Sequence, residues 1–474
     1  MSIHRFWLAG TAATGDTSLT VTHPYDGRAV GTVAVPDLSQ IETAVTAAYA
    51  ALTETTALPA HARAAALTHV HHRLAERREE VARTITAESG KPITGARVEV
   101  DRAASVFRWA AEETRRDSGS AQRLDTDPAA TGRMALTRRV PHGAVLGISP
   151  FNFPLNLVAH KIAPALAVGA PIILKPAPAT PMSALLLGEL LAETELPAGA
   201  VSVLPMPNER AAPLITDPRL PVISFTGGQF GWQLQQRAPH KHVTLELGGN
   251  AAAVVLADAD LDWAAQRIAL FGNNQAGQVC IGVQRVIVAD AVYDTFVPAL
   301  VQAVAALGTG APDDEATQVG PMIDEVAAQR VTDWIDEAVA AGATLLTGGH
   351  RDGTTVAPTV LADVPAGSRI AREEAFGPVL VVSRASGAAD AFAQVNDSEY
   401  GLQAGVFTSD VATAFRAYRE LEVGGVIIGD VPSFRADQMP YGGVKRSGVG
   451  KEGVRAAMDD LTYERVLVLT GLAM

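Results

Sequence analysis

Cys280 is the only cysteine in the 474-residue chain and the strongest candidate for a nucleophile. It lies in the stretch NNQAGQVCIGVQ (residues 273–284), in which Gly277 and Gly282 bracket the thiol. Glycines on both sides suit a loop whose backbone approaches a substrate closely. A lone cysteine can also be a small buried hydrophobe, so its chemistry depends on the groups that surround it.

Two further polar residues can complete a reaction centre around this thiol. Glu246, in LELGGN, offers a carboxylate that can accept the thiol proton or activate a water molecule. Thiol attack on a carbonyl carbon creates an oxyanion that needs fixed hydrogen-bond donors, and Asn152, in FNFP, offers an amide. A cysteine, a carboxylate and an amide with a nucleotide site between them predict aldehyde oxidation through a thiohemiacetal.

The elements that must position these residues follow from the hydrophobic pattern. Residues 1–35 alternate short strand-like runs with turns, and residues 38–116 are helical in pattern, with a helix boundary at Pro92. A linker spans 117–132, and Arg133–Val140 is predicted to be a strand. Three histidines in the helical region (His69, His71 and His72) lack a partner set for a metal, so no metal site is predicted.

From residue 144 the pattern predicts strands that alternate with helices, which is typical of a doubly wound parallel sheet. Its strands are expected at 144–149, 171–175, 201–204, 222–225 and 243–247. A second α/β unit follows Gly249, with strands at 252–256, 284–288, 343–346, 378–382, 404–407 and 425–428. Because Glu246 ends the first unit and Cys280 begins the second, the active site is expected in the crevice between them.

The segment FTGGQFG (residues 225–231) closes a strand and opens a helix, and no GxGxxG fingerprint is present. Glycines at 227, 228 and 231 permit a diphosphate to lie near that helix N-terminus. An ordinary glycine turn is the alternative for this motif taken alone.

Composition restricts the function classes. The net charge of −13 argues against nucleic acid as a partner, and it means that an anionic substrate needs a local cation. One cysteine excludes an internal disulfide and any multi-cysteine metal site. No signal pattern and no apolar run of about 18 residues is present, so a membrane is not expected as a partner and the cytoplasm is the expected location.

Seven motifs occur in one order between Ser149 and Gly453: SPFNFP, LKPA, FTGG, LELGGN, GQVC, EEAFGP and PYGGVKRSGVGKEG. With them the chain resembles the NAD(P)-dependent aldehyde dehydrogenases over nearly its whole length. The resemblance implies an α/β fold with a Rossmann-type cofactor domain (1–120 and 141–248), a catalytic domain (249–447) and a β oligomerisation arm (121–140 and 448–474). It also implies a homodimer or homotetramer, in which a final strand, Leu461–Leu472, pairs with Arg133–Val140 of another subunit.

The resemblance assigns roles to the candidate residues. Cys280 is the expected nucleophile, Asn152 with the backbone N–H of Cys280 the expected oxyanion hole, and Glu246 the expected base for thioester hydrolysis. Relatives that transfer the acyl group to coenzyme A tend to lack this glutamate. Glu246 therefore favours a hydrolytic enzyme. The alternatives are a coenzyme A-acylating semialdehyde dehydrogenase and a non-catalytic dinucleotide-binding protein.

The expected cofactor is NAD or NADP. Lys175 matches a lysine that binds the adenosine ribose, Glu374 holds the nicotinamide ribose, and Phe376 packs near the ring. Many NAD-preferring relatives carry a glutamate where this chain has Pro178, so NADP is permitted, and Gly228 stands where a serine is common. The remaining expected cofactor contacts are Ser149, Pro150, Phe151, Phe225, Thr226, Gly227, Gly231 and Leu247.

A short aldehyde, possibly with an anionic group, is the expected substrate. His160 follows Asn152 by two helical turns, and relatives that oxidise succinic semialdehyde place an arginine at its position. Arg435 lies on the C-terminal loop, in a pattern that resembles lactaldehyde, sulfolactaldehyde and phosphonoacetaldehyde dehydrogenases, and its guanidinium fork suits a carboxylate or phosphate. Asn156 is a third expected substrate contact. As alternatives, Arg435 can pair with Asp437, and His160 can be a neutral part of the pocket lining.

Overall fold

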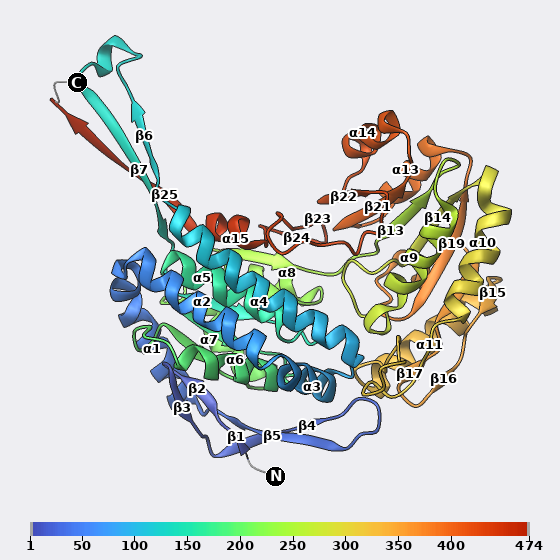
Figure 1. The fold of residues 1–474 in the computed structure, drawn as a ribbon, viewed down its shortest axis with the longest axis horizontal. Coiled ribbons are helices and arrows are strands. Elements are labelled where there is room, and N and C mark those ends of the chain that lie inside the picture. Colours follow the sequence, from blue (N-terminus) through green and yellow to red (C-terminus); the bar gives the residue numbers. More distant parts are fainter. Residues whose placement is uncertain (1–2, 472–474) are drawn as a thin grey trace.

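The structure is a computed structural model that describes residues 3–471. Figure 1 shows two α/β lobes and a narrow arm of strands that projects from the first lobe. The chain builds the first lobe, forms the second lobe from about residue 249, and returns at its C-terminal end to the first lobe and the arm. The predicted α/β class is confirmed.

The N-terminal residues contribute to two different sheets. A three-stranded sheet has the order β1-β5-β4, whereas β2 and β3 extend the large sheet of the first lobe. The bounds are β1 (Ile3–His4), β2 (Phe6–Leu8), β3 (Thr11–Ala13), β4 (Thr17–Thr22) and β5 (Ala29–Val35).

Four helices follow, as the sequence predicts: α1 (Leu38–Ala57), α2 (Ala60–Glu76), α3 (Arg78–Ser89) and α4 (Ile93–Arg116). Asp37 caps α1, because its side chain accepts a hydrogen bond from the Gln40 backbone while the Gln40 side chain accepts one from the Asp37 backbone. Gly90, with a positive φ, ends α3, and Pro92 precedes the first turn of α4.

The first lobe is built on an eight-stranded sheet with the order β24-β12-β11-β8-β9-β10-β2-β3. Its five central strands are parallel: β8 (Val145–Ile148), β9 (Ile172–Lys175), β10 (Val201–Val203), β11 (Val222–Thr226) and β12 (His242–Glu246). The helices between them are α5 (Asn156–Val168), α6 (Met182–Ala192), α7 (Ala212–Thr216) and α8 (Phe230–Arg237). Ser149, Lys175, Thr226 and Glu246 therefore lie at the carboxyl ends of neighbouring strands, where ligands of parallel sheets bind.

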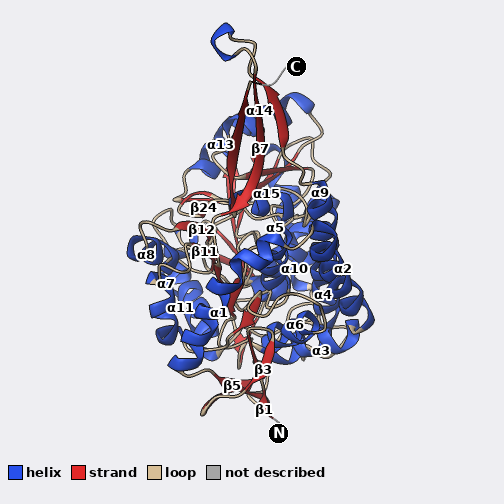
Figure 2. Cartoon of the chain, turned by 90° about the vertical axis from the view of Figure 1, so that its left-hand side faces the viewer, coloured by secondary structure: helices blue, strands red, loops and turns tan. Residues whose placement is uncertain are grey.

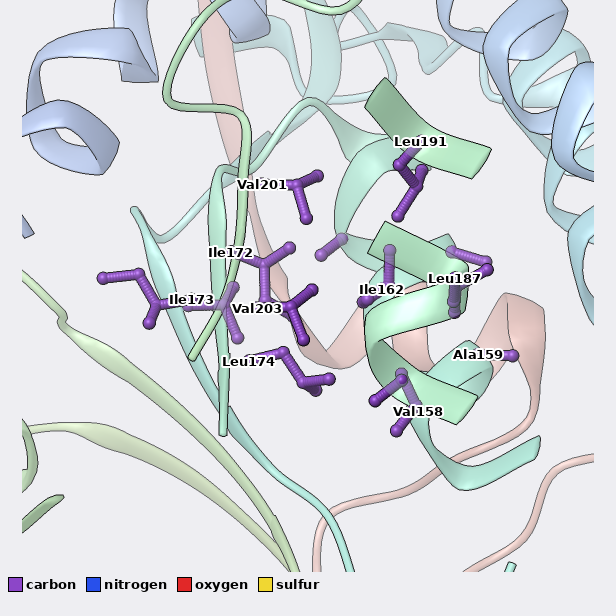
Figure 3. Close-up of a cluster of buried hydrophobic side chains, with 14 of the residues drawn as sticks. Val158, Ala159, Ile162, Ile172, Ile173, Leu174, Leu187, Leu191, Val201 and Val203 are labelled. Atoms are coloured by element: carbon purple, nitrogen blue, oxygen red, sulfur yellow. The ribbon is translucent and has the colours of Figure 1, made fainter. Parts of the chain in front are cut away.

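The core of this lobe explains why its strands are runs of apolar residues. Figure 3 shows side chains of β9 and β10 packed against those of α5 and α6. Parallel strands covered on both faces bury every side chain, so Ile172, Ile173 and Leu174 are all fully buried. This rigid layer fixes Lys175 at the end of β9.

The second lobe has a seven-stranded sheet with the order β15-β18-β19-β14-β13-β21-β22, parallel except for β15. Its strands are β13 (Ala252–Val255), β14 (Arg285–Ala289), β15 (Thr344–Thr347), β18 (Thr359–Ala362), β19 (Val379–Ala385), β21 (Gln403–Phe407) and β22 (Gly425–Ile428). Two short pairs lie outside it: β16 (Arg351–Asp352) with β17 (Thr355–Val356), and β20 (Tyr400–Gly401) with β23 (Val444–Lys445). Its helices are α9 (Leu261–Asn273), α10 (Asp290–Ala305), α11 (Glu325–Ala340), α12 (Arg369–Arg372), α13 (Ala388–Asn396) and α14 (Val411–Glu420).

The arm is a three-stranded antiparallel sheet of β6 (Ser120–Arg123), β7 (Arg133–Pro141) and β25 (Thr462–Thr470), in the order β25-β7-β6. Figure 2 shows it projecting beyond the helices of the lobes. The predicted pairing of the last strand with another subunit is wrong, since β25 pairs with β7 of its own chain from Thr462–Pro141 to Thr470–Arg133. The chain returns to the base of β7, where the backbone N–H of His142 donates to the Leu461 carbonyl. β25 therefore begins beside β7 of the same chain and pairs with it. Leu472 lies outside the described residues.

The structure also places residues 448–461 differently from the predicted arm boundary. β24 (Gly448–Val449) pairs with β12, and α15 (Val454–Asp460) packs Val454 and Met458 into the core of the first lobe. The arm therefore consists of β6, β7, β25 and their connections. Among residues 3–471, no helix combines the length and the apolar character that crossing a bilayer requires.

Candidate active site

A cavity of about 790 Å³ lies between the two lobes. Lys175, Phe225 and Glu246 line it from the first lobe, and Cys280 and Glu374 line it from the second. Cys280 and Glu246 thus meet at the crevice that the sequence predicts. A volume of this size is typical of a site for a small molecule or cofactor.

An unusual backbone holds Cys280 at this crevice. After α9, three consecutive residues, Gln275, Ala276 and Gly277, have φ values of 53°, 54° and 70°. A Cβ on Gly277 would lie 2.1 Å from the carbonyl oxygen of Gly377, so only glycine allows the two loops to meet. Gly277 is therefore needed because two protein loops pack closely at this point, whereas the sequence predicts a close approach of the backbone to a substrate.

The thiol of Cys280 is partly exposed and in contact with one polar side chain. Its Sγ lies 3.2 Å from the hydroxyl of Tyr441. Burial raises the pKa of Cys280 to about 12, and the hydrogen bond with Tyr441 and the charge of Arg435 oppose that rise. The resting group is therefore a neutral thiol that needs a proton acceptor before it can attack.

Glu246 provides a suitable acceptor. It is buried at the end of β12, and neither carboxylate oxygen has a hydrogen-bond partner. Burial and the negative charge of Glu452 raise its pKa well above the ordinary value, while Arg435 and Lys161 act in the opposite direction. A buried, unpartnered carboxyl group with a raised pKa is typical of a general base.

Asn152 lies beside the same loop. Its amide nitrogen donates to the Gln278 carbonyl at 2.7 Å, which ties the segment after β8 to the Cys280 loop. An amide has two N–H groups, so the second remains for another acceptor. The predicted oxyanion donor is thus close in space to Cys280, as the sequence anticipated.

Beneath Glu246 lies a buried charge cluster, which we define as Lys161, Glu452 and Arg435. Lys161 Nζ lies 3.3 Å from Glu452 Oε1, and Arg435 Nη2 lies 3.1 Å from Glu452 Oε2. Burial alone would raise the pKa of Glu452, but the two cations hold it at about 2. Sequence reasoning did not identify Lys161 or Glu452, although a lysine inside the mainly apolar α5 is a signal for a buried partner.

The three predicted substrate contacts do not line the large cavity. His160 is fully buried, and its pKa falls to about 4 because of burial and the nearby Arg435 charge, so the structure favours the neutral alternative. Arg435 is also buried, with Glu452 rather than Asp437 as its partner. Asn156 is buried at the start of α5, with its backbone N–H donating to Glu99 and its side-chain oxygen unpartnered.

Asp437 has two other partners. It accepts hydrogen bonds from Arg102 Nη2 at 2.8 Å and from His160 Nε2 at 3.2 Å. The Arg102 side chain, on α4, keeps about a quarter of its surface exposed (27%), whereas that of Arg435 keeps 6%. Arg102 is therefore the more accessible cation of this region, and no motif or periodicity of the sequence indicates it.

On the cofactor side, Lys175 and Glu374 face the cavity from opposite lobes. Lys175 Nζ donates to Asn208 Oδ1 at 2.8 Å, and burial lowers its pKa to about 8. Glu374 accepts a hydrogen bond from the Gly249 backbone at 2.9 Å, and burial raises its pKa to about 7. Phe376 has a positive φ of 46° and packs its ring edge-on against Phe151, with centroids 5.9 Å apart.

The remaining predicted cofactor residues divide into two groups. Gly231 does not line the cavity, because it packs against Leu247, whose side chain a Cβ on Gly231 would meet at 2.5 Å. The others line the cavity: Ser149, Pro150, Phe151, Pro178, Phe225, Thr226, Gly227, Gly228 and Leu247. Gly228 faces open space, since nothing lies within 4 Å of the position of its Cβ.

These residues fit an extended dinucleotide. The cavity has a lysine near one end, a carboxyl group from the opposite lobe and an open glycine turn at the start of α8. Ser149 adds a buried hydroxyl with no hydrogen-bond partner. Unpartnered buried polar groups of this kind are expected where a ligand supplies the partner. In the described part of the chain, no group of three or more His, Cys, Asp or Glu side chains is placed to hold a metal ion.

Comparisons with known proteins agree with this geometry. The sequence model of the Aldehyde dehydrogenase family matches residues 11–467. A 3-sulfolactaldehyde dehydrogenase from Priestia aryabhattai is 44% identical over 398 residues, which cover 84% of this chain and 83% of the relative. The succinate-semialdehyde dehydrogenase [NADP(+)] of Escherichia coli (strain K12) is 37% identical over 94% of this chain and 92% of its own length.

Solved structures show the same fold. Aldehyde dehydrogenase 21 from Physcomitrella patens, in complex with the reaction product succinate, superposes with a TM-score of 0.98 at 44% identity and covers 100% of this chain and 99% of that one. The NADP-dependent glyceraldehyde-3-phosphate dehydrogenase from Bacillus halodurans C-125, complexed with NADP, gives a TM-score of 0.96 at 35% identity, with 100% of both chains covered. The chain therefore belongs to the aldehyde dehydrogenase family and oxidises an aldehyde to an acid with NAD(P) as cofactor.

Proposed function

We propose that Cys280 attacks the aldehyde carbon and that Glu246 first accepts the thiol proton. The observation that carries this assignment is the meeting of the two groups in one cavity, with Glu246 free of any hydrogen-bond partner. The attack forms a C–S bond and a thiohemiacetal oxyanion. In our proposal the second N–H of Asn152 and the backbone N–H of Cys280 donate to that oxygen. The hydrogen bond from Asn152 to the Gln278 carbonyl, beside Cys280, supports this role.

The cofactor residues hold the dinucleotide on the other side of the thiol. When bound, the nicotinamide ring accepts the hydride from the substrate carbon. In our proposal Lys175 binds the adenosine ribose, Glu374 binds the nicotinamide ribose, and Phe376 packs near the ring. Phe151, edge-on to Phe376, limits the movement of that aromatic side chain.

Loss of the hydride leaves an acyl group on Cys280 as a thioester. Once Glu246 has passed the thiol proton to solvent, its carboxylate takes a proton from a water molecule and the resulting hydroxide adds to the thioester carbon. The C–S bond then breaks, the acid leaves, and the thiolate of Cys280 takes a proton from Glu246. The buried position of Glu246 and its lack of partners support this second role. A base that activates water favours hydrolysis of the thioester over transfer of the acyl group to coenzyme A.

For the substrate we propose a short aldehyde that carries an anionic group. The named relatives act on 3-sulfolactaldehyde and succinate semialdehyde, whose second functional group is an anion. The chain itself has net charge −13, so an anion must be attracted by a local cation. Two cations lie close to the cavity without lining it: Arg102, which is the more exposed and pairs with Asp437, and Arg435, which is buried and has an unpartnered Nε.

Steady-state kinetics with a set of aldehydes test this assignment. Succinic semialdehyde, phosphonoacetaldehyde and glyceraldehyde 3-phosphate are compared with propanal and benzaldehyde, in the wild type and in Arg102→Leu, Arg435→Leu and His160→Leu. We expect the anionic aldehydes to have the higher kcat/KM, and Arg102→Leu to lower it by about tenfold or more for these alone, as for a lost charged hydrogen bond. His160→Leu is expected to affect charged and uncharged aldehydes equally. Higher kcat/KM for the uncharged aldehydes would refute the proposal.

We also propose that the protein is a homodimer or homotetramer that assembles through the arm. β25 carries a run of exposed apolar side chains at Val466, Leu467 and Val468, each at least half exposed. Apolar side chains that remain exposed do not stabilise a monomer, and contiguous apolar surface commonly marks an interface between proteins.

A further inference from the structure

The hydroxyl of Tyr441 is within hydrogen-bonding distance of the thiol, and the proposed chemistry does not use it. It lies 3.2 Å from Cys280 Sγ, on a side chain that is only 4% exposed. Ile281 and Leu402 pack with the Tyr441 ring in one small hydrophobic cluster that also contacts Cys280. Packing therefore fixes the direction of the hydroxyl.

We propose that Tyr441 donates a hydrogen bond to Cys280 Sγ and thereby stabilises the thiolate that attacks the aldehyde. The proposal rests on the role of Cys280 as the nucleophile, and it adds a donor to that reaction. In the direction proposed, the O–H of Tyr441 points at sulfur, and the proton stays on the phenol oxygen throughout.

The chemistry of the pair favours the phenol as the donor. A phenol O–H is a stronger donor than a thiol S–H, and a thiolate has no proton to give. Burial raises the pKa of Tyr441 well above its ordinary value, so the hydroxyl keeps its proton at every pH at which the enzyme would work. Tyr441 can therefore donate to the thiolate but cannot act as the base that removes its proton.

Arg435 lies over the ring of Tyr441 and makes the Tyr441 hydroxyl a stronger hydrogen-bond donor. Its guanidinium carbon lies 3.8 Å from the centroid of the Tyr441 ring, and Glu452 holds the guanidinium there through Nη2 at 3.1 Å. A cation over the ring draws electron density from the phenol and makes its O–H a better donor. Arg435 thus acts on the thiol through Tyr441 as well as by its own charge.

The other charged groups near the thiol make such a donor necessary. Glu374 and Glu246 both disfavour a negative charge on sulfur, and Arg435 favours it. For Tyr441 itself, the neighbouring ionisable groups are Cys280, Arg435 and Glu246. With two carboxyl groups close by, a hydrogen bond from a neutral donor is one of the few ways to stabilise the thiolate.

The test is the pH dependence of Cys280 alkylation in Tyr441→Phe, which keeps the ring and its packing. Because Cys280 is the only cysteine, the rate with iodoacetamide reports a single group. We expect the rate at neutral pH to fall by about tenfold or more, and the midpoint of the pH profile to move upward, as for a lost hydrogen bond to a charged group. At high pH the rates of variant and wild type should converge, and kcat/KM should follow the same profile.

Tyr293→Phe is the matched control. Tyr293, on α10, also carries a guanidinium over its ring, that of Arg384 at 3.6 Å, but it is remote from the thiol. Its replacement should leave the alkylation profile unchanged. If Tyr441→Phe does not fold, 3-fluorotyrosine at position 441 replaces it, since this analogue keeps the shape, is a stronger donor, and should move the profile to lower pH.

An unchanged or faster alkylation profile in Tyr441→Phe, or an unchanged one with 3-fluorotyrosine, would overturn the inference. The role of Cys280 is tested separately. If alkylation still abolishes turnover while the profile is unchanged, only the Tyr441 inference fails. If fully alkylated enzyme remains active, the proposed nucleophile is wrong as well.

Discussion

Glu246 and Glu452 are two buried carboxyl groups whose pKa values move in opposite directions. Burial and the charge of Glu452 raise the pKa of Glu246, whereas Lys161 and Arg435 outweigh the effect of burial and hold the pKa of Glu452 at about 2. Two carboxyl groups close together cannot both ionise easily, and the cations decide which of them does. Glu246 is thereby left with a pKa well above that of an ordinary carboxyl group.

This relationship predicts a pH profile that depends on Glu452. Glu246 acts as a base only when it is deprotonated, so turnover should fall as the pH decreases through its raised pKa. Glu452→Gln removes the negative charge and leaves Lys161 and Arg435, both of which favour ionised Glu246. The acidic limb of kcat should therefore move to lower pH, which a profile of initial rates would show.

Glu246→Gln is the companion variant for this prediction. It should lose the acidic limb and slow thioester hydrolysis by about 10²–10⁴-fold, the usual contribution of a general base. Loss of Glu246 should also slow the attack by the thiol, but it should slow thioester hydrolysis more than hydride transfer, so stopped-flow fluorescence should show a burst of NAD(P)H before a slow steady state. An acidic limb in Glu452→Gln at the wild-type pH, or a Glu246→Gln variant with normal turnover, would refute this part of the account.

Cofactor preference should depend on two residues of the cavity lining. Pro178 places no carboxylate near the ribose site, but Glu209 also lines the cavity and interacts with Lys175 through its charge. We expect NADP to be accepted at least comparably to NAD. Pro178→Glu should shift the ratio of kcat/KM values towards NAD by about tenfold, and Glu209→Gln should shift it towards NADP, because a 2′-phosphate is repelled by a carboxylate. A wild-type preference for NAD above about a hundredfold would contradict the expectation.

The arm should determine the oligomeric state. Val466 and Val468, two residues apart on β25, project from the same face of the strand and are both exposed. Replacing both with aspartate should lower the molar mass measured by light scattering, since buried charges destabilise an apolar interface. Val411→Asp, at an equally exposed apolar position on α14, serves as the control and should leave the mass unchanged. An assembly that is unaffected by the double change would place the interface elsewhere.

The sequence predicts most of the fold because its strands are short apolar runs separated by helices. It predicts Cys280 and Glu246 for a related reason: each is a polar residue beside glycines at the end of an element. Lys161 and Glu452 could not be paired in this way, since they are 291 positions apart and meet only through the docking of the C-terminal loop on the first lobe. Tyr441 lies within the motif PYGGVKRSGVGKEG, but its contact with the thiol depends on how two loops distant in sequence pack together.

The pairing of the arm strands and the substrate contacts are features that the sequence does not predict correctly. An amphipathic strand does not encode its partner, so the pairing of β25 within its own chain follows from the path of residues 448–461 rather than from the strand itself. Helical periodicity predicts that His160 shares a helix face with Asn152, which is wrong, because α5 begins only at Asn156 and His160 does not line the cavity. Burial beside Arg435 makes this histidine neutral, and Asp437 turns towards Arg102.

The central claim is that the substrate is oxidised while it is covalently bound to Cys280. The most direct measurement is the intact mass of Glu246→Gln after brief mixing with an aldehyde substrate and NAD(P), followed by acid quenching and peptide mapping. We predict a mass increase of one acyl group per chain on the peptide that contains Cys280, dependent on the dinucleotide and absent when Cys280→Ala is added to the variant. An acyl group on another residue, or wild-type turnover by Cys280→Ala, would contradict the account.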